Sequence, residues 1–127
     1  MFNDITITPF HPIGKDERGI TKSFELPRDQ ASFIYVFRKA KSISGNTYHE
    51  GKNLGTNPKV FILIQGEIKI SYRHKDKKEA QHLLLSEPCV ISIQPLITHK
   101  IEAITDMIIL ECNSIADIQN DRFKLEV

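Results

Sequence analysis

Tryptophan is absent from this chain, and no apolar run approaches the roughly 20 residues that a membrane-spanning helix needs. The first residues carry neither a basic cluster nor an apolar segment, so we expect no export signal and a cytoplasmic protein. Positive and negative side chains are nearly equal in number, with 17 Lys and Arg against 16 Asp and Glu. We therefore expect neither nucleic acid nor a membrane surface as a partner.

Cysteine is scarce, with only Cys89 and Cys112 in 127 residues. The two residues are not in a C-x-x-C spacing, and each lies in an apolar, strand-like run. We interpret them as buried thiols in a reducing compartment rather than as a disulfide.

Short β-like runs, separated by turn residues, are what the chain has in abundance. Many short strands at this spacing, with little helical periodicity, predict an all-β sandwich or jelly roll in a single domain over residues 1–127. Ser114 begins a Ser-x-x-Asp pattern that predicts a short C-terminal helix to Asn120. The expected strands are Ile5–Phe10, Gly19–Phe24, Phe33–Phe37, Asn46–His49, Val60–Gln65, Ile68–Arg73, Gln81–Leu85, Val90–Ile93, His99–Ala103 and Met107–Cys112.

The most informative stretch runs from Lys59 through an apolar segment to Gly66 and into the alternating residues that follow. We read Gly66 as a tight corner between two antiparallel strands. Gly45-Asn-Thr-Tyr-His49 lies upstream of it, and Pro95-Leu-Ile-Thr-His99 lies downstream. This order predicts a small β-barrel with a site in its mouth.

These motifs resemble the cupin superfamily, whose fold is a double-stranded β-helix, over about residues 16–111. Three histidines and a Glu hold one metal ion in a typical cupin. Here Thr47 takes the first histidine's place, His49 the second's, Lys59 the Glu's and His99 the third's, while Gly66 and Pro95 match the pattern. Two imidazoles rarely hold a metal without further ligands, and an inward Lys59 would repel the ion. We therefore predict no metal and no other cofactor.

A Lys seven residues before the corner Gly also resembles the dTDP-4-keto-6-deoxysugar 3,5-epimerases and the related 3,4-ketoisomerases. The segment Asp16-Glu-Arg18-Gly19 echoes their acidic-Arg-Gly start. This resemblance implies a sugar-nucleotide cupin, isomerase- or epimerase-like, acting on a dTDP- or UDP-linked keto sugar in surface polysaccharide synthesis. Small barrels of this kind hide their edge strands by pairing N-terminal strands across a two-fold axis, so we expect a homodimer. The run Phe33–Phe37 is apolar at every position, and we expect it to be buried on both faces.

The resemblance assigns roles to individual residues. His49 would move a proton, Lys59 would stabilise the enolate, and His99 would orient the sugar. The remaining candidates would bind substrate: Arg18 at the diphosphate, Tyr35 and Tyr72 at the barrel mouth, and Thr47 and Glu111 beside the catalytic groups.

Other interpretations stay open at this stage. The epimerases have a base histidine where Thr47 stands, and their acid is a late Tyr, whereas this chain has no Tyr after Tyr72. A non-catalytic cupin that binds a small ligand is one alternative, and a metal cupin using His49, His99 and Glu111 is another. Arg18 could equally pair with Asp16 or Glu17 in a turn, and Lys59 could lie on the surface.

Overall fold

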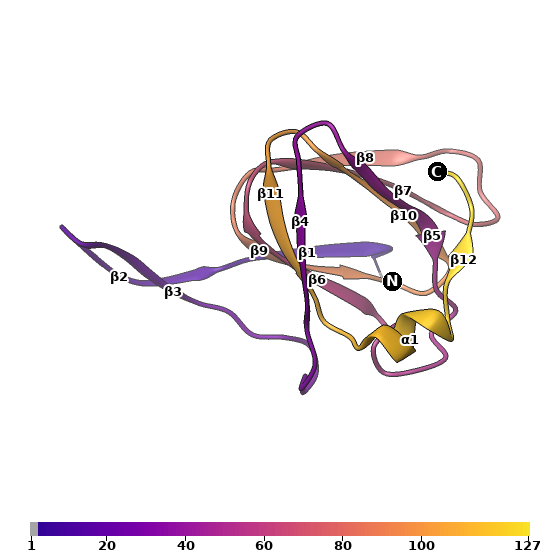
Figure 1. Cartoon of the computed structure of the whole chain (residues 1–127), viewed down its shortest axis with the longest axis horizontal. Helices are drawn as coiled ribbons and strands as arrows, with labels where there is room; N and C mark the ends of the chain where they lie inside the picture. The colour runs from indigo at the N-terminus through magenta and orange to yellow at the C-terminus, as the bar shows by residue number, and fades with distance from the viewer. Residues whose placement is uncertain (1–2) are drawn as a thin grey trace.

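The computed structural model describes residues 3–127, and two antiparallel five-stranded sheets form its body (Figure 1). The first sheet has the spatial order β1 (Ile5–Pro9), β9 (Cys89–Ile93), β6 (Lys59–Gln65), β11 (Met107–Glu111), β4 (Ile34–Arg38). The second has the order β12 (Phe123–Lys124), β5 (Ile43–Tyr48), β10 (Ile97–Ala103), β7 (Ile68–His74), β8 (Gln81–Leu85). The all-β prediction is confirmed.

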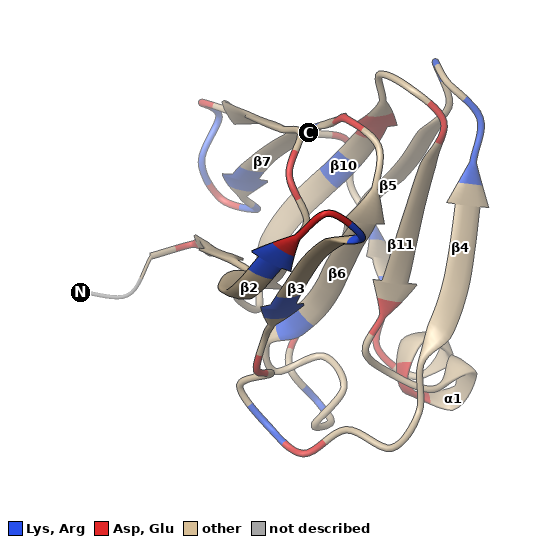
Figure 2. Cartoon of the chain, turned by 90° about the vertical axis from the view of Figure 1, so that its left-hand side faces the viewer, with Lys and Arg blue, Asp and Glu red and all other residues tan. Residues whose placement is uncertain are grey.

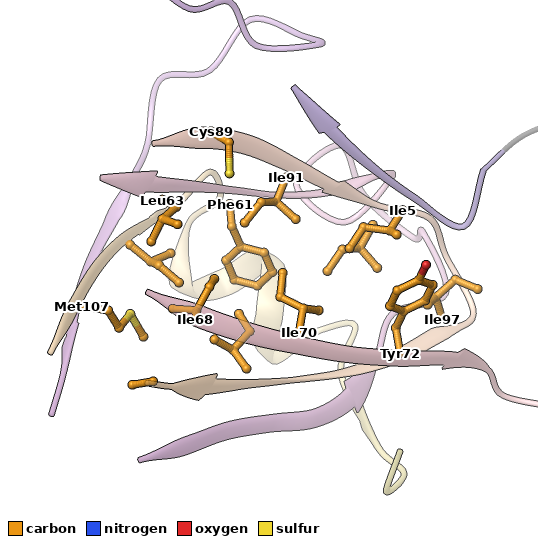
Figure 3. Packing of buried hydrophobic residues seen from close by; sticks show 14 residues of the cluster. Ile5, Phe61, Leu63, Ile68, Ile70, Tyr72, Cys89, Ile91, Ile97 and Met107 are labelled. Carbon is orange, nitrogen blue, oxygen red and sulfur yellow. The ribbon is translucent and has the colours of Figure 1, made fainter. Parts of the chain in front are cut away.

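The main hydrophobic core lies between these sheets (Figure 3). β6 shows how the strand period builds it: Phe61 and Leu63 face the inner core, while Val60 and Ile62 form a second cluster on the opposite face of the strand. Segments from outside the sheet, including Phe10 and Leu26, pack against that second cluster. β6 is therefore apolar along its length because both of its faces are covered.

The corner at Gly66 differs from its sequence interpretation in one respect. β6 and β7 belong to different sheets, so the corner passes the chain between sheets and does not close a paired hairpin. The backbone of Gly66 has φ +102°, and a Cβ placed there would lie 2.4 Å from the carbonyl oxygen of Asp106. Glycine is required here by both the dihedral angle and the space.

A hairpin formed by β2 (His11–Asp16) and β3 (Gly19–Ser23) projects from the body (Figure 1). Residues 14–16 complete β2, and the turn of the hairpin follows at residues 17–18. Nearly every residue of the hairpin is exposed, including Ile13 and Ile20, and charges of both signs lie along it (Figure 2).

The run Phe33–Phe37 was expected to be buried on both faces, and in this chain it is not. β4 is the edge strand of its sheet. Val36 packs against the core, whereas Phe33, Tyr35 and Phe37 are 46%, 64% and 45% exposed. One face of the strand is thus an exposed aromatic stripe.

The predicted C-terminal helix is present as α1 (Ile115–Gln119). The Ser114 hydroxyl accepts a hydrogen bond from the backbone N–H of Asp117, and the Asp117 carboxylate accepts one from the backbone N–H of Ser114. These two bonds complete the expected capping box. Among residues 3–127, no helix has the length and apolar character needed to cross a membrane.

Candidate active site

A cavity of about 490 Å³ lies between the two sheets. Its walls come from β4, β5, β6, β10 and β11, and α1 and the C-terminal segment complete them. A cavity of this size is suited to a small-molecule ligand.

Six of the eight predicted site residues line this cavity: Tyr35, Thr47, His49, Lys59, His99 and Glu111. The strand period explains why they converge. Lys59 has the same parity as the inward-facing Phe61 on β6, and Glu111 has the same parity as the inward-facing Ile109 on β11. Thr47 pairs directly with His99 across β5 and β10, so their side chains share the inner face.

The other two predicted residues are outside the lining. Arg18 lies at the tip of the projecting hairpin, its side chain 85% exposed and paired with Asp16 at 2.8 Å. This contact matches the alternative in which Arg18 is a turn residue. Tyr72 is buried in the hydrophobic core beside Ile97, with its hydroxyl donating to Gln81 Oε1 at 3.1 Å (Figure 3). Its position is that of a packing residue and not of a residue at the cavity mouth.

The two imidazoles lie close together, with ring centroids 5.7 Å apart. His49 Nδ1 is 2.5 Å from the backbone oxygen of Asp121, and His99 Nδ1 is 3.1 Å from that of Ile97. A carbonyl oxygen can only accept, so each Nδ1 carries the hydrogen and donates it. The Nε2 atom of each neutral ring is therefore the free lone pair, and it is the atom that can accept a proton from a ligand.

Lys59 is almost fully buried and supplies the cation of the site. Its Nζ lies 3.7 Å from Glu111 Oε1, donates to Asn113 Oδ1, and is 5.0 Å from the centre of the Phe61 ring. Of the two interpretations of Lys59 left open by the sequence, the inward one is correct.

Burial controls the protonation of these groups. The pKa of His99 is lowered to about 3, mainly by desolvation and also by the nearby His49 and Lys59 charges, which together outweigh the hydrogen bond to Ile97. Desolvation also lowers the pKa of His49, helped by the charges of Lys59 and Arg122. For Lys59, desolvation lowers the pKa and the Glu111 charge opposes it. Both imidazoles are consequently neutral at pH 7.

A metal ion does not fit the donors present. Within residues 3–127, no three His, Cys, Asp or Glu side chains are grouped so that they could hold one ion. The alternative metal set of His49, His99 and Glu111 is therefore not assembled, and the Lys59 ammonium would repel a cation beside the imidazoles.

Sequence reasoning missed several residues of the site. Asn113 binds the Lys59 ammonium, and Asp121 receives the hydrogen bond of His49 through its backbone. Arg38, Arg122 and Lys124 also line the cavity. The Arg-Phe-Lys alternation at 122–124 is a period-2 signal that could have predicted a strand facing the site, whereas nothing in the sequence singles out Asn113.

Comparison with known proteins finds solved structures with a similar fold. The structure is similar to QdtA, a sugar 3,4-ketoisomerase from Thermoanaerobacterium thermosaccharolyticum solved with TDP, at 19% identity and a TM-score of 0.74, over 98% of this chain and 90% of that one. A 3,4-ketoisomerase from Helicobacter canadensis matches at 16% identity and a TM-score of 0.74, over 95% and 90%. CapF, a capsular polysaccharide assembling protein from Staphylococcus aureus, matches at 27% identity and a TM-score of 0.64.

The CapF similarity covers 94% of this chain but only 35% of CapF. No family model and no curated protein matches the sequence. The chain has the cupin-like, antiparallel β fold of the sugar ketoisomerases, which confirms at the level of fold the resemblance drawn from the motifs.

Proposed function

We propose that this protein is a sugar-nucleotide isomerase or epimerase-like enzyme that moves a proton beside the keto group of a dTDP- or UDP-linked sugar. The observation that carries the proposal is the convergence of His49, His99 and Lys59 in one cavity of a fold shared with sugar ketoisomerases. Separate positions in the sequence thus supply a base, a second imidazole and a cation to a single ligand site.

One such reaction converts a 4-keto sugar to a 3-keto sugar. The neutral His49 takes the proton from C3, the C3–H electrons form a C3–C4 double bond, and charge develops on O4. Lys59 stabilises that negative charge through a direct hydrogen bond or through the positive charge of its ammonium group. The proton taken from C3 is then delivered to C4, and the O3 proton is transferred to O4. His99 orients the sugar hydroxyls through its Nε2 lone pair.

Known ligands of the neighbours support the substrate class. QdtA was solved with TDP and, as a variant, with TDP-4-keto-6-deoxyglucose. Tyr35 lines the cavity, and its aromatic ring would stack on a base or a sugar ring. Thr47 and Glu111 add a hydroxyl and a carboxylate for sugar hydroxyls. The name of CapF supports a place in surface polysaccharide synthesis.

Deuterium exchange with the solvent tests whether the protein is an enzyme. In D₂O, the wild-type protein is expected to incorporate deuterium beside the keto group of dTDP-4-keto-6-deoxyglucose, detected by mass spectrometry. His49→Ala should slow the exchange by at least about 100-fold while leaving dTDP binding within a few-fold. His11→Ala is the matched control, because His11 is exposed and outside the cavity. Equal exchange in the His49 variant would remove that residue from the mechanism.

A second candidate is a non-catalytic nucleotide-sugar sensor or accessory subunit. The observation that favours it is Thr47, which lies at the ligand cavity where the resemblance expects the base histidine. A Thr hydroxyl is a weak base near neutral pH without an activator. Thermal stabilisation by dTDP or UDP, together with no exchange in the wild-type protein, would select this candidate.

We also propose that residues 1–127 form one domain that acts as a homodimer in the cytoplasm. The aromatic stripe of Phe33, Tyr35 and Phe37 and the exposed Ile13 and Ile20 of the projecting hairpin support a second copy as partner. The free, buried thiols of Cys89 and Cys112 support a reducing compartment. Light scattering coupled to gel filtration should give twice the mass of the chain, and a monomer at micromolar concentration would contradict the dimer.

A further inference from the structure

We infer that Arg122 and Lys124, from the C-terminal segment, form the site in this cavity that binds the diphosphate of the ligand. The inference rests on the proposed nucleotide-sugar function and gives that function a specific anion site. It also moves the phosphate-binding role away from Arg18, whose guanidinium is paired with Asp16 on the hairpin.

Strand register places the two cations on the cavity side. Lys124 of β12 pairs with Thr47 of β5, and Thr47 lines the cavity, so the Lys124 side chain leaves the strand on the same face. Phe123 points the other way and stacks on Tyr48, with ring centroids 5.3 Å apart. Arg122, two residues before Lys124, is again on the cavity side.

The backbone that carries these cations is fixed at both ends. On one side, the Asp121 carboxylate accepts from the backbone N–H groups of Glu50 and Lys52 at 2.7 and 2.8 Å and from the Thr56 hydroxyl at 2.7 Å. On the other side, Leu125 donates to the Asn46 carbonyl at 2.9 Å. Binding an anion therefore has to order only the two side chains and not the chain segment.

The charge of the cavity favours an anion. Its lining contains four basic side chains, Arg38, Lys59, Arg122 and Lys124, against the single carboxylate of Glu111. Lys59 already faces Glu111 and Asn113, and Arg38 donates to Ser44 at 3.0 Å. Within residues 3–127, neither Arg122 nor Lys124 forms a salt bridge.

The position of Arg122 links this anion site to the catalytic groups. Arg122 and His49 line the same cavity, and the Arg122 charge makes a small contribution to the lowered pKa of His49, after desolvation and the charge of Lys59. A ligand whose phosphates lie against Arg122 would therefore place its sugar near His49. A planar guanidinium suits paired phosphate oxygens and an ammonium adds a point charge, so the pair suits a diphosphate better than a neutral sugar.

The test compares two variants that each lose two positive charges. Arg122→Gln/Lys124→Gln removes the proposed site, whereas Lys77→Gln/Lys78→Gln removes two exposed lysines between β7 and β8, outside the cavity. Calorimetric titration with dTDP, UDP and thymidine, at low and high salt, measures what each pair contributes. Arg122→Lys/Lys124→Arg keeps the charge and controls for local packing.

We expect the Arg122/Lys124 glutamine variant to bind dTDP and UDP at least about tenfold more weakly, and to lose most of the salt dependence. Thymidine binding and the melting temperature should not change. The Lys77/Lys78 variant and the charge-keeping variant should bind dTDP within about twofold of wild type. Wild-type affinity in the Arg122/Lys124 glutamine variant would overturn the inference and leave the proposed function standing. A wild-type protein that binds neither dTDP nor UDP would overturn both.

Discussion

The Lys59 ammonium, on the first residue of β6, lies 3.7 Å from the Glu111 carboxylate, on the last residue of β11. The two strands are neighbours, and Glu111 pairs with Phe61, so the sheet itself holds the two charges together. Lys59 is buried and Glu111 is partly accessible, which leaves the pair open to a ligand on the cavity side. The contact explains how a lysine is retained inside the barrel.

Replacing Lys59 by methionine should therefore reduce both stability and activity. Glu111 and Asn113 lose their cation, so we expect unfolding free energy to fall by about 1–3 kcal/mol. Loss of the charge at the enolate should slow solvent exchange by about 10²–10³-fold. Urea denaturation and deuterium exchange measure the two effects.

A double-mutant cycle checks the cause of that stability loss. Lys59→Met/Glu111→Gln should be less destabilised than the sum of its single variants, because the unpaired carboxylate is gone. Lys77→Met, on the exposed turn, should change stability by no more than about 0.5 kcal/mol. Strict additivity in the cycle would show that the two charges do not interact.

Asp121→Asn should loosen the wall of the cavity that holds His49. Burial raises the pKa of Asp121, but hydrogen bonds from Glu50, Thr56 and Lys52 outweigh it and lower the pKa overall, so the group is a carboxylate that accepts from all three. An amide presents one nitrogen that cannot accept, and we expect a loss of about 1–3 kcal/mol.

Two readouts separate this local effect from general damage. Asp76→Asn, at an exposed turn, should leave the denaturation midpoint unchanged. In Asp121→Asn, the ¹⁵N shifts of the His49 ring should show a mixture of tautomers in place of a single Nδ1–H form, because the carbonyl that fixes the tautomer lies on the altered residue. A single tautomer with unchanged stability would contradict the role assigned to Asp121.

The pH dependence of stability follows from the two buried imidazoles. The pKa of His99 falls to about 3 and that of His49 is also lowered, while in the unfolded chain both titrate near about 6.5. Below that pH the two imidazoles are protonated in the unfolded chain but stay neutral in the folded protein. Their contribution to stability is therefore complete above about pH 6.5 and is lost as the pH falls toward 3.

Urea denaturation between pH 4 and 8 measures this effect. Each histidine should contribute a slope of up to roughly 1 kcal/mol per pH unit below pH 6. His99→Gln should reduce the slope, whereas His11→Gln, at an exposed position, should not. An identical slope in the wild-type and His99 proteins would show that the imidazole protonates freely in the folded state.

The sequence was most informative where side-chain period and turn chemistry act locally. Alternation located most strands within one or two residues, and the Ser114 capping box located the helix. The motif order grouped His49, Lys59 and His99, and all three line one cavity: Lys59 and His99 lie on β6 and β10, and His49 directly follows β5.

Tertiary context accounts for what the sequence did not reveal. Arg18 and Tyr72 were assigned from their neighbours in the chain, but the hairpin extends away from the body and Tyr72 fills the core. The exposed stripe at Phe33, Tyr35 and Phe37 is apolar, so composition alone predicted burial. β12 contains only two residues and is defined by its pairing with β5, a long-range contact that the short alternation at residues 122–124 does not specify.

Gly66→Ala tests the corner that carries the chain from one sheet to the other. The backbone there has φ +102°, and the added methyl would lie 2.4 Å from the Asp106 carbonyl oxygen and 2.8 Å from Met107 Cα. Both neighbours are backbone atoms that cannot rotate away, so we expect a loss of about 2–4 kcal/mol in unfolding free energy. Gly14→Ala is the matched control, since a Cβ there meets nothing within 4 Å and its φ is outside the left-handed range. Thermal denaturation of the two variants should separate them by several degrees, and equal melting temperatures would mean that the corner adapts to a side chain without strain.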